Sequence, residues 1–208
     1  MNNKRYPVPA TEHRVEEEIQ RSRFITTAAP VGTVAEAQAF IQRMREEFAD
    51  ATHNCWAYLV GPPGTSSHVG MSDDGEPHGT AGRPMLNVLS HCPAGDIAVV
   101  VTRYYGGVKL GKGGLVRAYG GGVNLVLETL PLAEKIYRKR CQIIIDYSHI
   151  KSFQRLVAEF ETEVIEEIFE VDATFVCDIP DDYLQPFAEK LESITNGAAL
   201  WENLDESS

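Results

Sequence analysis

The chain has 208 residues, 43% of them hydrophobic and 24% charged, with a formal net charge of −11 at pH 7. These values indicate a globular protein that forms one large domain or two small ones. No apolar run approaches the roughly 18 residues of a membrane-spanning helix, and the first residues lack the apolar segment of a secretory signal, so we expect a cytoplasmic protein that binds no membrane.

The cysteines are too far apart for a paired metal site or a disulfide framework. They are separated by 37, 49 and 36 positions along the chain. We therefore expect free, mostly buried thiols and neither a metal nor another cofactor. The four residues are Cys55, Cys92, Cys141 and Cys177.

Charge divides the chain into two parts near Glu134. Residues 1–134 hold 12 Lys and Arg against 14 Asp and Glu, a net charge of −2, whereas residues 135–208 hold 7 against 16, a net charge of −9. This asymmetry predicts two domains, 1–134 and 135–208, with different partners.

The first domain is predicted to contain both helices and strands. Thr33 and Glu36 form a capping box, and an apolar stripe with helical spacing follows, which predicts a helix from Val34 to about Phe48. The run from Asp96 to Tyr105 is apolar on both faces at its centre and predicts an interior strand. The other expected elements are strands at 14–18, 23–29 and 54–60, a polar loop over 61–80, and helices at about 84–91 and 115–130.

The second domain is predicted to follow the order β-α-β-β-α-β, which is the ferredoxin-like split unit. Apolar residues recur with helical spacing between Ile150 and Phe160, and Asn196-Gly197 is a typical helix C-terminus. Pro186 fits the second helix only in its first turn. The expected elements are a strand at 137–147, a helix at 150–160, strands at 163–169 and 171–179, a helix at about 182–194 and a short strand at 198–201.

The segment from Arg103 to Asn124 contains eight glycines and four basic residues but no acidic residue. Unshielded backbone amides and nearby cations both favour negatively charged ligands, although single glycines also serve turns and close packing. We therefore expect a site for an anion in this segment. Its candidate residues are Arg103, Gly106, Gly107, Lys109, Gly111, Lys112, Gly113, Gly114 and Arg117.

Two kinds of anionic ligand suit this segment. The succession of strand, glycine loop and helix resembles a nucleotide phosphate loop, but Gly113 stands where such loops place a magnesium-binding Ser or Thr, which disfavours nucleotide hydrolysis. Tyr104, Tyr105 and Tyr119 interleave with the cations, a pattern that suits stacked bases of single-stranded RNA. The alternative interpretation is that these tyrosines anchor the edge of the sheet.

An acidic cluster precedes the glycine-rich segment, in the run SDDGEPHGTAG from Ser72 to Gly82. A rigid turn is the favoured interpretation, with Gly75 at a positive φ and Thr80 capping the next helix. Asp73 or Asp74 could also lie against the glycine segment and form an ion pair with one of its arginines. A role of Asp74 as an acid or base is the second possibility.

The histidines give a weaker signal. His53 and Cys55 lie on one face of a predicted strand and could form a reactive pair, but a core position is favoured for Cys55. No Ser or Cys nucleophile motif and no helical metal-binding spacing is present. His53 remains a candidate ligand-binding residue.

These motifs resemble the IMPACT family, in its bacterial two-domain branch. The likeness is carried by GRPML at 82–86, VVTRYYGGVKLG at 100–111 and SDDGEP at 72–77. The resemblance implies a first domain built as a ribosomal-protein-like α/β sandwich similar to domain IV of elongation factor G, and a second similar to its domain V. It also implies a role near translation, without catalytic residues that can be mapped.

Together these observations predict a non-enzymatic regulatory protein that binds RNA or a ribosome-associated partner through residues 103–117. The alternative is an enzyme or sensor for a small phosphorylated metabolite or nucleotide. The sequence leaves the oligomeric state open.

Overall fold

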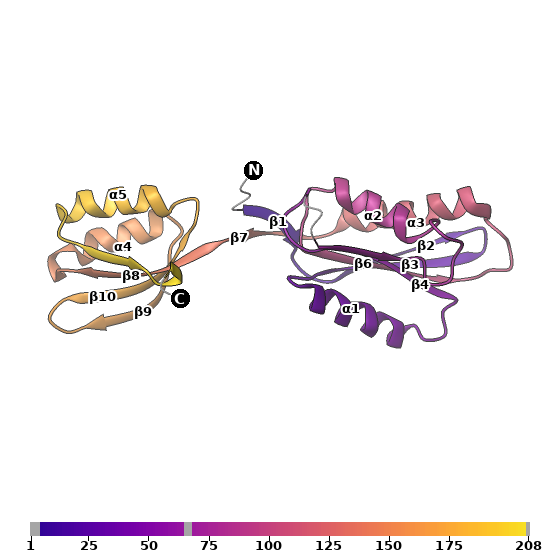
Figure 1. Ribbon diagram of the computed structural model, residues 1–208, viewed down its shortest axis with the longest axis horizontal. Coiled ribbons are helices and arrows are strands. Elements are labelled where there is room, and N and C mark those ends of the chain that lie inside the picture. The colour runs from indigo at the N-terminus through magenta and orange to yellow at the C-terminus, as the bar shows by residue number, and fades with distance from the viewer. Residues whose placement is uncertain (1–4, 65–67, 207–208) are drawn as a thin grey trace. The chain divides into compact units, whose positions relative to one another are not determined.

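The computed structural model describes residues 5–64 and 68–206, which form two compact units (Figure 1). The larger unit comprises Tyr6–Lys135, and the smaller comprises the chain from Ile136 onward. Arg5 groups with the smaller unit, since its guanidinium forms ion pairs with Glu161 and Asp182, at 2.7 Å each. Arg5 therefore belongs to the smaller unit, which a single boundary at 134 does not anticipate.

The larger unit is built on a five-stranded antiparallel sheet. The strands at 14–18, 23–29, 54–60 and 96–105 are confirmed, with small shifts at their ends. The fifth strand, β5, lies in the segment predicted as a polar loop, and its four residues are too few to give an alternating pattern. In sheet order the strands are β2 (His13–Ile19), β3 (Ser22–Pro30), β6 (Ile97–Tyr104), β4 (His53–Leu59) and β5 (Val69–Ser72).

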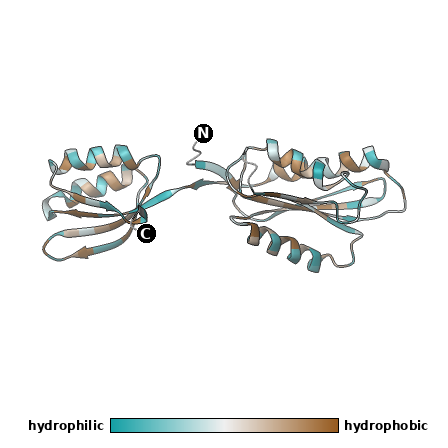
Figure 2. Ribbon diagram, in the orientation of Figure 1, coloured by the Kyte–Doolittle hydropathy of each residue, from teal (hydrophilic) through white to brown (hydrophobic). Residues whose placement is uncertain are grey.

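Helices cover both faces of this sheet, with α1 (Val34–Glu47) on one face and α2 (Gly82–His91) and α3 (Gly111–Thr129) on the other (Figure 1). The central strand β6 is buried from both sides, as predicted. Its odd-numbered residues from Ile97 to Val101 pack in the core beneath α2 and α3, and Ala98 and Val100 pack in the core beneath α1. Figure 2 shows hydrophobic residues, coloured brown, in this sheet between the two layers of helices.

The predicted N-cap of α1 at Thr33 is confirmed, whereas the reciprocal bond of Glu36 goes to the residue before the cap. The Thr33 hydroxyl oxygen accepts a hydrogen bond from the Glu36 amide at 3.1 Å. The Glu36 carboxylate accepts one from the Gly32 amide at 2.8 Å, one residue before the cap. The first interaction satisfies an amide that the helix leaves unpaired, and the second fixes the chain as it enters the helix.

Helix α3 begins at Gly111, four residues before the predicted start at Leu115. Glycine has a low helix propensity, which is why the sequence places these residues in a loop. Packing outweighs that preference, since Leu115, Tyr119 and Val123 are buried in the core. Part of the glycine-rich segment is therefore the first turn of a helix.

Two further strands, β1 (Arg5–Pro9) and β7 (Leu132–Ile136), pair in a two-stranded sheet that the sequence does not predict. Both are five residues long. Strand β1 ends at Pro9, and Pro131 directly precedes β7. Because proline is uncommon in strands, the composition of neither segment predicts a strand.

The smaller unit confirms the predicted order β-α-β-β-α-β. Its antiparallel sheet has the strand order β11-β8-β10-β9, with α4 and α5 on one face (Figure 1). Pro186 is the third residue of α5, and that helix ends at Asn196 with φ 51°, as the sequence indicates. The elements are β8 (Arg138–Ile145), α4 (Ile150–Glu159), β9 (Glu163–Phe169), β10 (Ala173–Pro180), α5 (Leu184–Thr195) and β11 (Leu200–Asn203). The whole chain is thus an α+β protein with antiparallel sheets.

Candidate anion-binding groove

A groove of about 400 Å³ lies where β6 ends and α3 begins, in the larger unit. Three segments meet there: the acidic turn, the last residues of β6 with the loop after it, and the first turns of α3. The groove is lined by Glu76, Pro77, Arg103, Tyr105, Lys109, Leu110, Gly111, Lys112 and Leu115.

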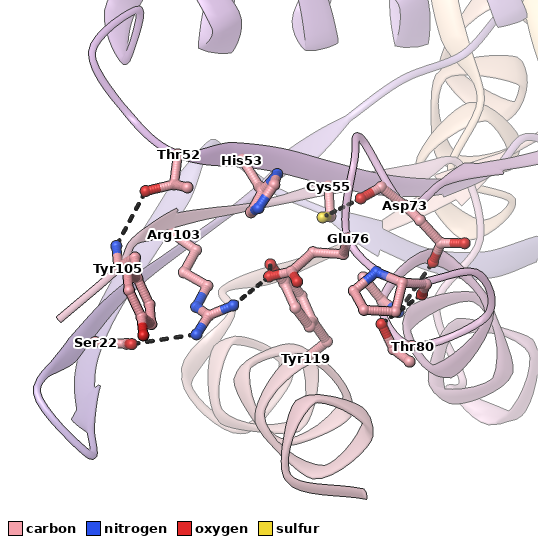
Figure 3. Close-up of polar contacts among 12 residues, drawn as sticks. Ser22, Thr52, His53, Cys55, Asp73, Glu76, Thr80, Arg103, Tyr105 and Tyr119 are labelled. Atoms are coloured by element: carbon pink, nitrogen blue, oxygen red, sulfur yellow. Dashed lines mark hydrogen bonds and ion pairs between the residues drawn. The ribbon is translucent and has the colours of Figure 1, made fainter. Parts of the chain in front are cut away.

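The floor of the groove is a buried polar cluster (Figure 3). Arg103 Nη1 donates to Glu76 Oε1 at 2.5 Å, and Tyr119 Oη donates to the same oxygen at 2.8 Å. Arg103 Nη2 donates to Ser22 Oγ at 3.3 Å. Arg103 is 5% exposed, and its Nε has no hydrogen-bond partner in the described part of the chain. A buried guanidinium nitrogen without an acceptor is costly, so an acceptor that reached it would stabilise this floor.

Aromatic rings hold the Arg103 guanidinium in place. Its central carbon lies 5.5 Å from the centroid of the Phe24 ring and 5.5 Å from that of Tyr105. Phe24 is fully buried, whereas Tyr105 is 45% exposed at the rim of the groove. Tyr105 thus presents one part of its ring to the arginine and the rest to solvent, as a stacking platform would.

The predicted pairing of Asp73 or Asp74 with the arginines of the glycine segment is wrong. Glu76 is the partner of Arg103. Asp73 instead accepts hydrogen bonds from the amides of Gly79, Ala81 and Gly82 at 2.7, 3.0 and 2.9 Å. Burial opposes ionisation of Asp73, but these three amides outweigh it and lower its pKa.

Asp73 also replaces the expected helix cap. The Thr80 hydroxyl donates to the carbonyl of Pro77 at 2.6 Å, so it does not cap α2. The N-terminal amides of α2 are satisfied by the Asp73 carboxylate, eight and nine residues earlier in the chain. Asp73 therefore has a structural role, which is to join the acidic turn to the start of α2.

Asp74 of the acidic turn and His53 of β4 form a small network of their own. Asp74 Oδ2 accepts from the Asn54 amide at 2.7 Å, and its Oδ1 accepts from Arg45 at 3.0 Å. His53 Nδ1 lies 2.8 Å from the carbonyl oxygen of Asp74. The turn itself has the predicted positive φ at Gly75, 88°. Neither Asp74 nor His53 lines the groove.

The rim of the groove carries the features that favour an anion. Leu110 occupies the N-cap of α3 and forms no side-chain cap, and the first turn of α3 contains no acidic residue. The first amides of the helix are therefore open to a ligand, at the positive end of the helix dipole. Lys109 and Lys112 are exposed and line the same groove.

The glycines of the segment divide by role. Gly107 and Gly111 adopt positive φ values of 83° and 71°, which turn the chain into α3. A Cβ at Gly106 would lie 1.8 Å from the Arg21 carbonyl oxygen, so this glycine serves a close backbone contact. Gly113 and Gly114 lie in the first turn of α3.

Nine predicted site residues are absent from the groove lining: Tyr104, Gly106, Gly107, Gly113, Gly114, Arg117, Asp73, Asp74 and His53. The hydroxyl of Tyr104 donates to the carboxylate of Asp50 at 2.7 Å, away from the groove lining. Arg117 is exposed farther along α3, and Tyr119 lies in the core with only its hydroxyl in the polar cluster. Glu76 and Tyr119 form the floor with Arg103, and no pattern in the sequence distinguishes Glu76 from the two aspartates before it.

Neither Cys55 nor Tyr119 is activated as a nucleophile. Burial raises the pKa of the Cys55 thiol well above its usual range, and burial likewise raises that of the Tyr119 phenol. Cys55 is fully buried, as predicted, and donates to the Asp73 carbonyl at 3.0 Å. Among residues 5–64 and 68–206, no three His, Cys, Asp or Glu side chains gather as metal ligands, and no helix is long and apolar enough to span a membrane.

Both units have counterparts among known proteins. The family model "Impact N-terminal domain" matches residues 20–127, and the model "Domain of unknown function (DUF1949)" matches residues 143–198. An "IMPACT family member" of Haemophilus influenzae is 37% identical over 200 residues, which cover 96% of this chain and 97% of that protein. "IMPACT family member YigZ" of Escherichia coli is 39% identical over 191 residues, 92% of this chain and 94% of that protein.

A solved structure extends this likeness to three dimensions. It is titled "Crystal structure of an hypothetical protein" and matches with a TM-score of 0.69 and 37% sequence identity. The match covers 98% of this chain and 99% of that chain. The similarity therefore includes both units.

Proposed function

The chain belongs to the IMPACT family, and we propose that it is a non-enzymatic regulatory protein, linked to translation, that binds single-stranded RNA through the groove. One observation carries the proposal. The open amides of α3, the two rim lysines, the exposed ring of Tyr105 and the buried guanidinium of Arg103 all border one groove of about 400 Å³.

The groove offers separate places for a phosphate and a base. A phosphate at the start of α3 would accept hydrogen bonds from its first amides and would be neutralised by Lys109 and Lys112. A base would stack on Tyr105, with Leu110 and Leu115 as apolar walls. Stacking on an aromatic ring tolerates every base, so this arrangement suits RNA binding with little sequence preference.

The link to translation is supported by the family resemblance alone. We also propose that the two units are similar to domains IV and V of elongation factor G. A ribosome-associated protein is the proposed protein partner. Since residues 135–208 carry a net charge of −9, the smaller unit suits a basic protein better than it suits RNA.

Titration of a short single-stranded RNA tests the proposal. We expect fluorescence anisotropy with an eight-nucleotide oligomer to show saturable binding that weakens at least about tenfold in Lys109→Ala/Lys112→Ala, because stacking on Tyr105 alone does not hold a phosphate. The matched control is Lys151→Ala, which removes an exposed lysine from α4 and should change affinity less than twofold. Equal affinities of the double variant and the wild type would refute RNA binding at the groove.

A small phosphorylated metabolite or nucleotide is the second candidate ligand. It is favoured by the closed floor of the groove and by a volume in the range of small-molecule sites. A ligand present at 100 times its dissociation constant stabilises the folded state by about 2.7 kcal/mol, which a thermal-shift screen of nucleotides and sugar phosphates would detect. Stabilisation by such a compound without RNA binding would favour this alternative, and no shift with any of them would exclude it.

A further inference from the structure

The strand β11 (Leu200–Asn203) lies at one edge of the sheet in the smaller unit. It pairs with β8 in a continuous antiparallel register, and its outer edge pairs with no strand among residues 5–64 and 68–206. An outer edge presents unpaired backbone donors and acceptors to any extended chain that meets it.

The two edges of this sheet differ in how they are protected. The other edge strand, β9, has a register shift opposite Val176 and Cys177, which leaves Ile165 unpaired, and it carries three glutamates. Bulges and charges of this kind discourage the addition of a strand. In contrast, β11 has no shift in its register. Both edge strands expose large apolar side chains, Ile165, Ile168 and Phe169 on β9 and Leu200 (67%) and Trp201 (42%) on β11, so the register shift and the glutamates of β9 are what distinguish the two edges.

A hollow lies on each side of β11. One of about 410 Å³ is formed between α5 and β11, with Ala188, Ala199 and Trp201 in its lining. Another of about 240 Å³ is lined by Ile144, Leu200 and Trp201 with polar neighbours. Since side chains of a strand point alternately to the two faces, a strand added beside β11 would place alternate side chains in the two hollows.

The charge around these hollows is entirely acidic. Glu189 and Glu192 on α5 line the larger hollow, and Glu202 on β11 lines the smaller one. The described lining of either hollow contains no lysine or arginine. Lys190 points elsewhere and lies 3.9 Å from Glu159 of α4. The chemistry of the surface therefore complements a basic chain.

We propose that the outer edge of β11 binds a basic, extended segment of another protein by strand addition. Backbone hydrogen bonds join the segment to β11. On one face of the added strand its apolar side chains contact Trp201 and its lysines or arginines face Glu189 and Glu192, and on the other face an apolar side chain contacts Leu200. This inference is independent of the groove in the larger unit, since it concerns other residues and another class of ligand.

Two synthetic peptides test the proposal on the full chain. One has the sequence Lys-Lys-Val-Val-Lys-Lys-Val, which presents both lysine and valine on each face of a strand, and the other has Glu in place of each Lys. The chain has two tryptophans, so the indole signals of Trp201 and Trp56 in a ¹H–¹⁵N NMR titration serve as reporter and internal control. We expect the basic peptide to shift the Trp201 signal saturably while Trp56 stays unchanged, and the acidic peptide to shift neither.

Matched variants separate charge from backbone pairing. Glu189→Lys/Glu192→Lys changes two exposed residues, so it should leave the fold intact, abolish binding of the basic peptide and allow binding of the acidic one. Trp201→Ala should weaken the basic peptide at least tenfold, measured by isothermal titration. The basic peptide N-methylated at alternate residues should not bind, because it cannot donate to the β11 edge.

Three results would overturn the proposal. Binding of both peptides with equal affinity would show that charge does not select the ligand, and binding of the N-methylated peptide would exclude strand addition. A Trp201 shift that appears on raising the protein concentration, without peptide, would show that a second copy of this chain occupies the edge.

Discussion

Arg103 is the residue around which the candidate site is organised. Its charge is buried and is balanced by Glu76, while Ser22 and the rings of Phe24 and Tyr105 fix its position. A buried charge pair is strongly destabilised when one partner is removed, because the other charge is left without compensation. The floor of the groove therefore depends on the pair as a unit.

We predict that Glu76→Ala lowers the free energy of unfolding by about 3–5 kcal/mol, because it leaves Arg103 buried and uncompensated. Tyr119→Phe is the control, since it removes one hydrogen bond to Glu76 and should cost about 1–2 kcal/mol. Urea denaturation measures both. A loss below about 1 kcal/mol in Glu76→Ala would mean that Arg103 reaches solvent.

Asp73 gives the acidic turn a pH-dependent stability. Its pKa is lowered in the folded state from an ordinary value of 3.8, so its contribution is complete above that value and is lost as the pH falls through the folded pKa. We predict that Asp73→Asn costs about 1–2 kcal/mol at pH 7, as loss of a helix cap does, and progressively less below about pH 4. Thermal melts of both proteins from pH 7 to pH 3 check this, and a difference that grows on acidification would contradict it.

At the scale of elements, α3 combines two functions in one helix. Its first turn borders the groove, and its middle packs on β2 and β3 through glycines. A Cβ at Gly122 would lie 2.6 Å from Thr26 Oγ1, whereas a Cβ at Gly121 would meet nothing within 4 Å. Gly122 is thus required by the close packing of α3 on β3, whereas the space around Gly121 would admit a larger side chain.

We predict opposite effects for the two alanine substitutions. Gly121→Ala should stabilise the protein by about 0.5–1 kcal/mol, since alanine is the better helix former. Gly122→Ala should destabilise it by about 1–3 kcal/mol, because the added methyl forces α3 and β3 apart. Equal effects on the denaturation midpoint would show that Gly122 is not a packing position.

The elements that the sequence predicts are those with strong local signals. The capping box sets the start of α1, and the apolar run of β6 sets an interior strand. The start of α3 and the strand β5 are decided by packing and pairing with distant residues, which leave no local pattern. Glycine-rich or very short segments are therefore where sequence patterns are least informative here.

The candidate site was likewise predictable only in the part that has a local sequence signal. The sequence locates the basic glycine segment, but it does not tell which of three nearby carboxylates faces Arg103. That choice depends on the positive φ of Asp74 and Gly75, 42° and 88°, which turn the chain so that Asp73 meets α2 and Glu76 meets Arg103. Backbone geometry of this kind is not encoded in the order of acidic residues.

At the scale of the whole molecule, charge separates two kinds of surface. The smaller unit holds most of the negative charge, whereas the groove is bordered by lysines in the larger unit. Negative charge elsewhere on the chain would repel a phosphate backbone at low salt, so the groove must act locally. Basic protein segments and phosphate ligands are therefore expected on different units.

We predict a shallow salt dependence for RNA binding. Two neutralised phosphates, one for each rim lysine, give a slope of about −1.4 in a plot of log affinity against log salt concentration. The slope should approach zero in Lys109→Ala/Lys112→Ala. Anisotropy titrations at several potassium chloride concentrations measure it, and a slope steeper than about −4 would indicate a wider basic surface than the groove.

The most direct test of the central claim is a ¹H–¹⁵N NMR titration of the full chain with a 5′-phosphorylated trinucleotide RNA. If phosphate binds at the start of α3, the amide signals of Gly111, Lys112, Gly113 and Gly114 shift together and saturate, with no comparable change in the smaller unit. Signals that stay fixed there, or that shift equally at exposed lysines throughout the chain, would contradict the account.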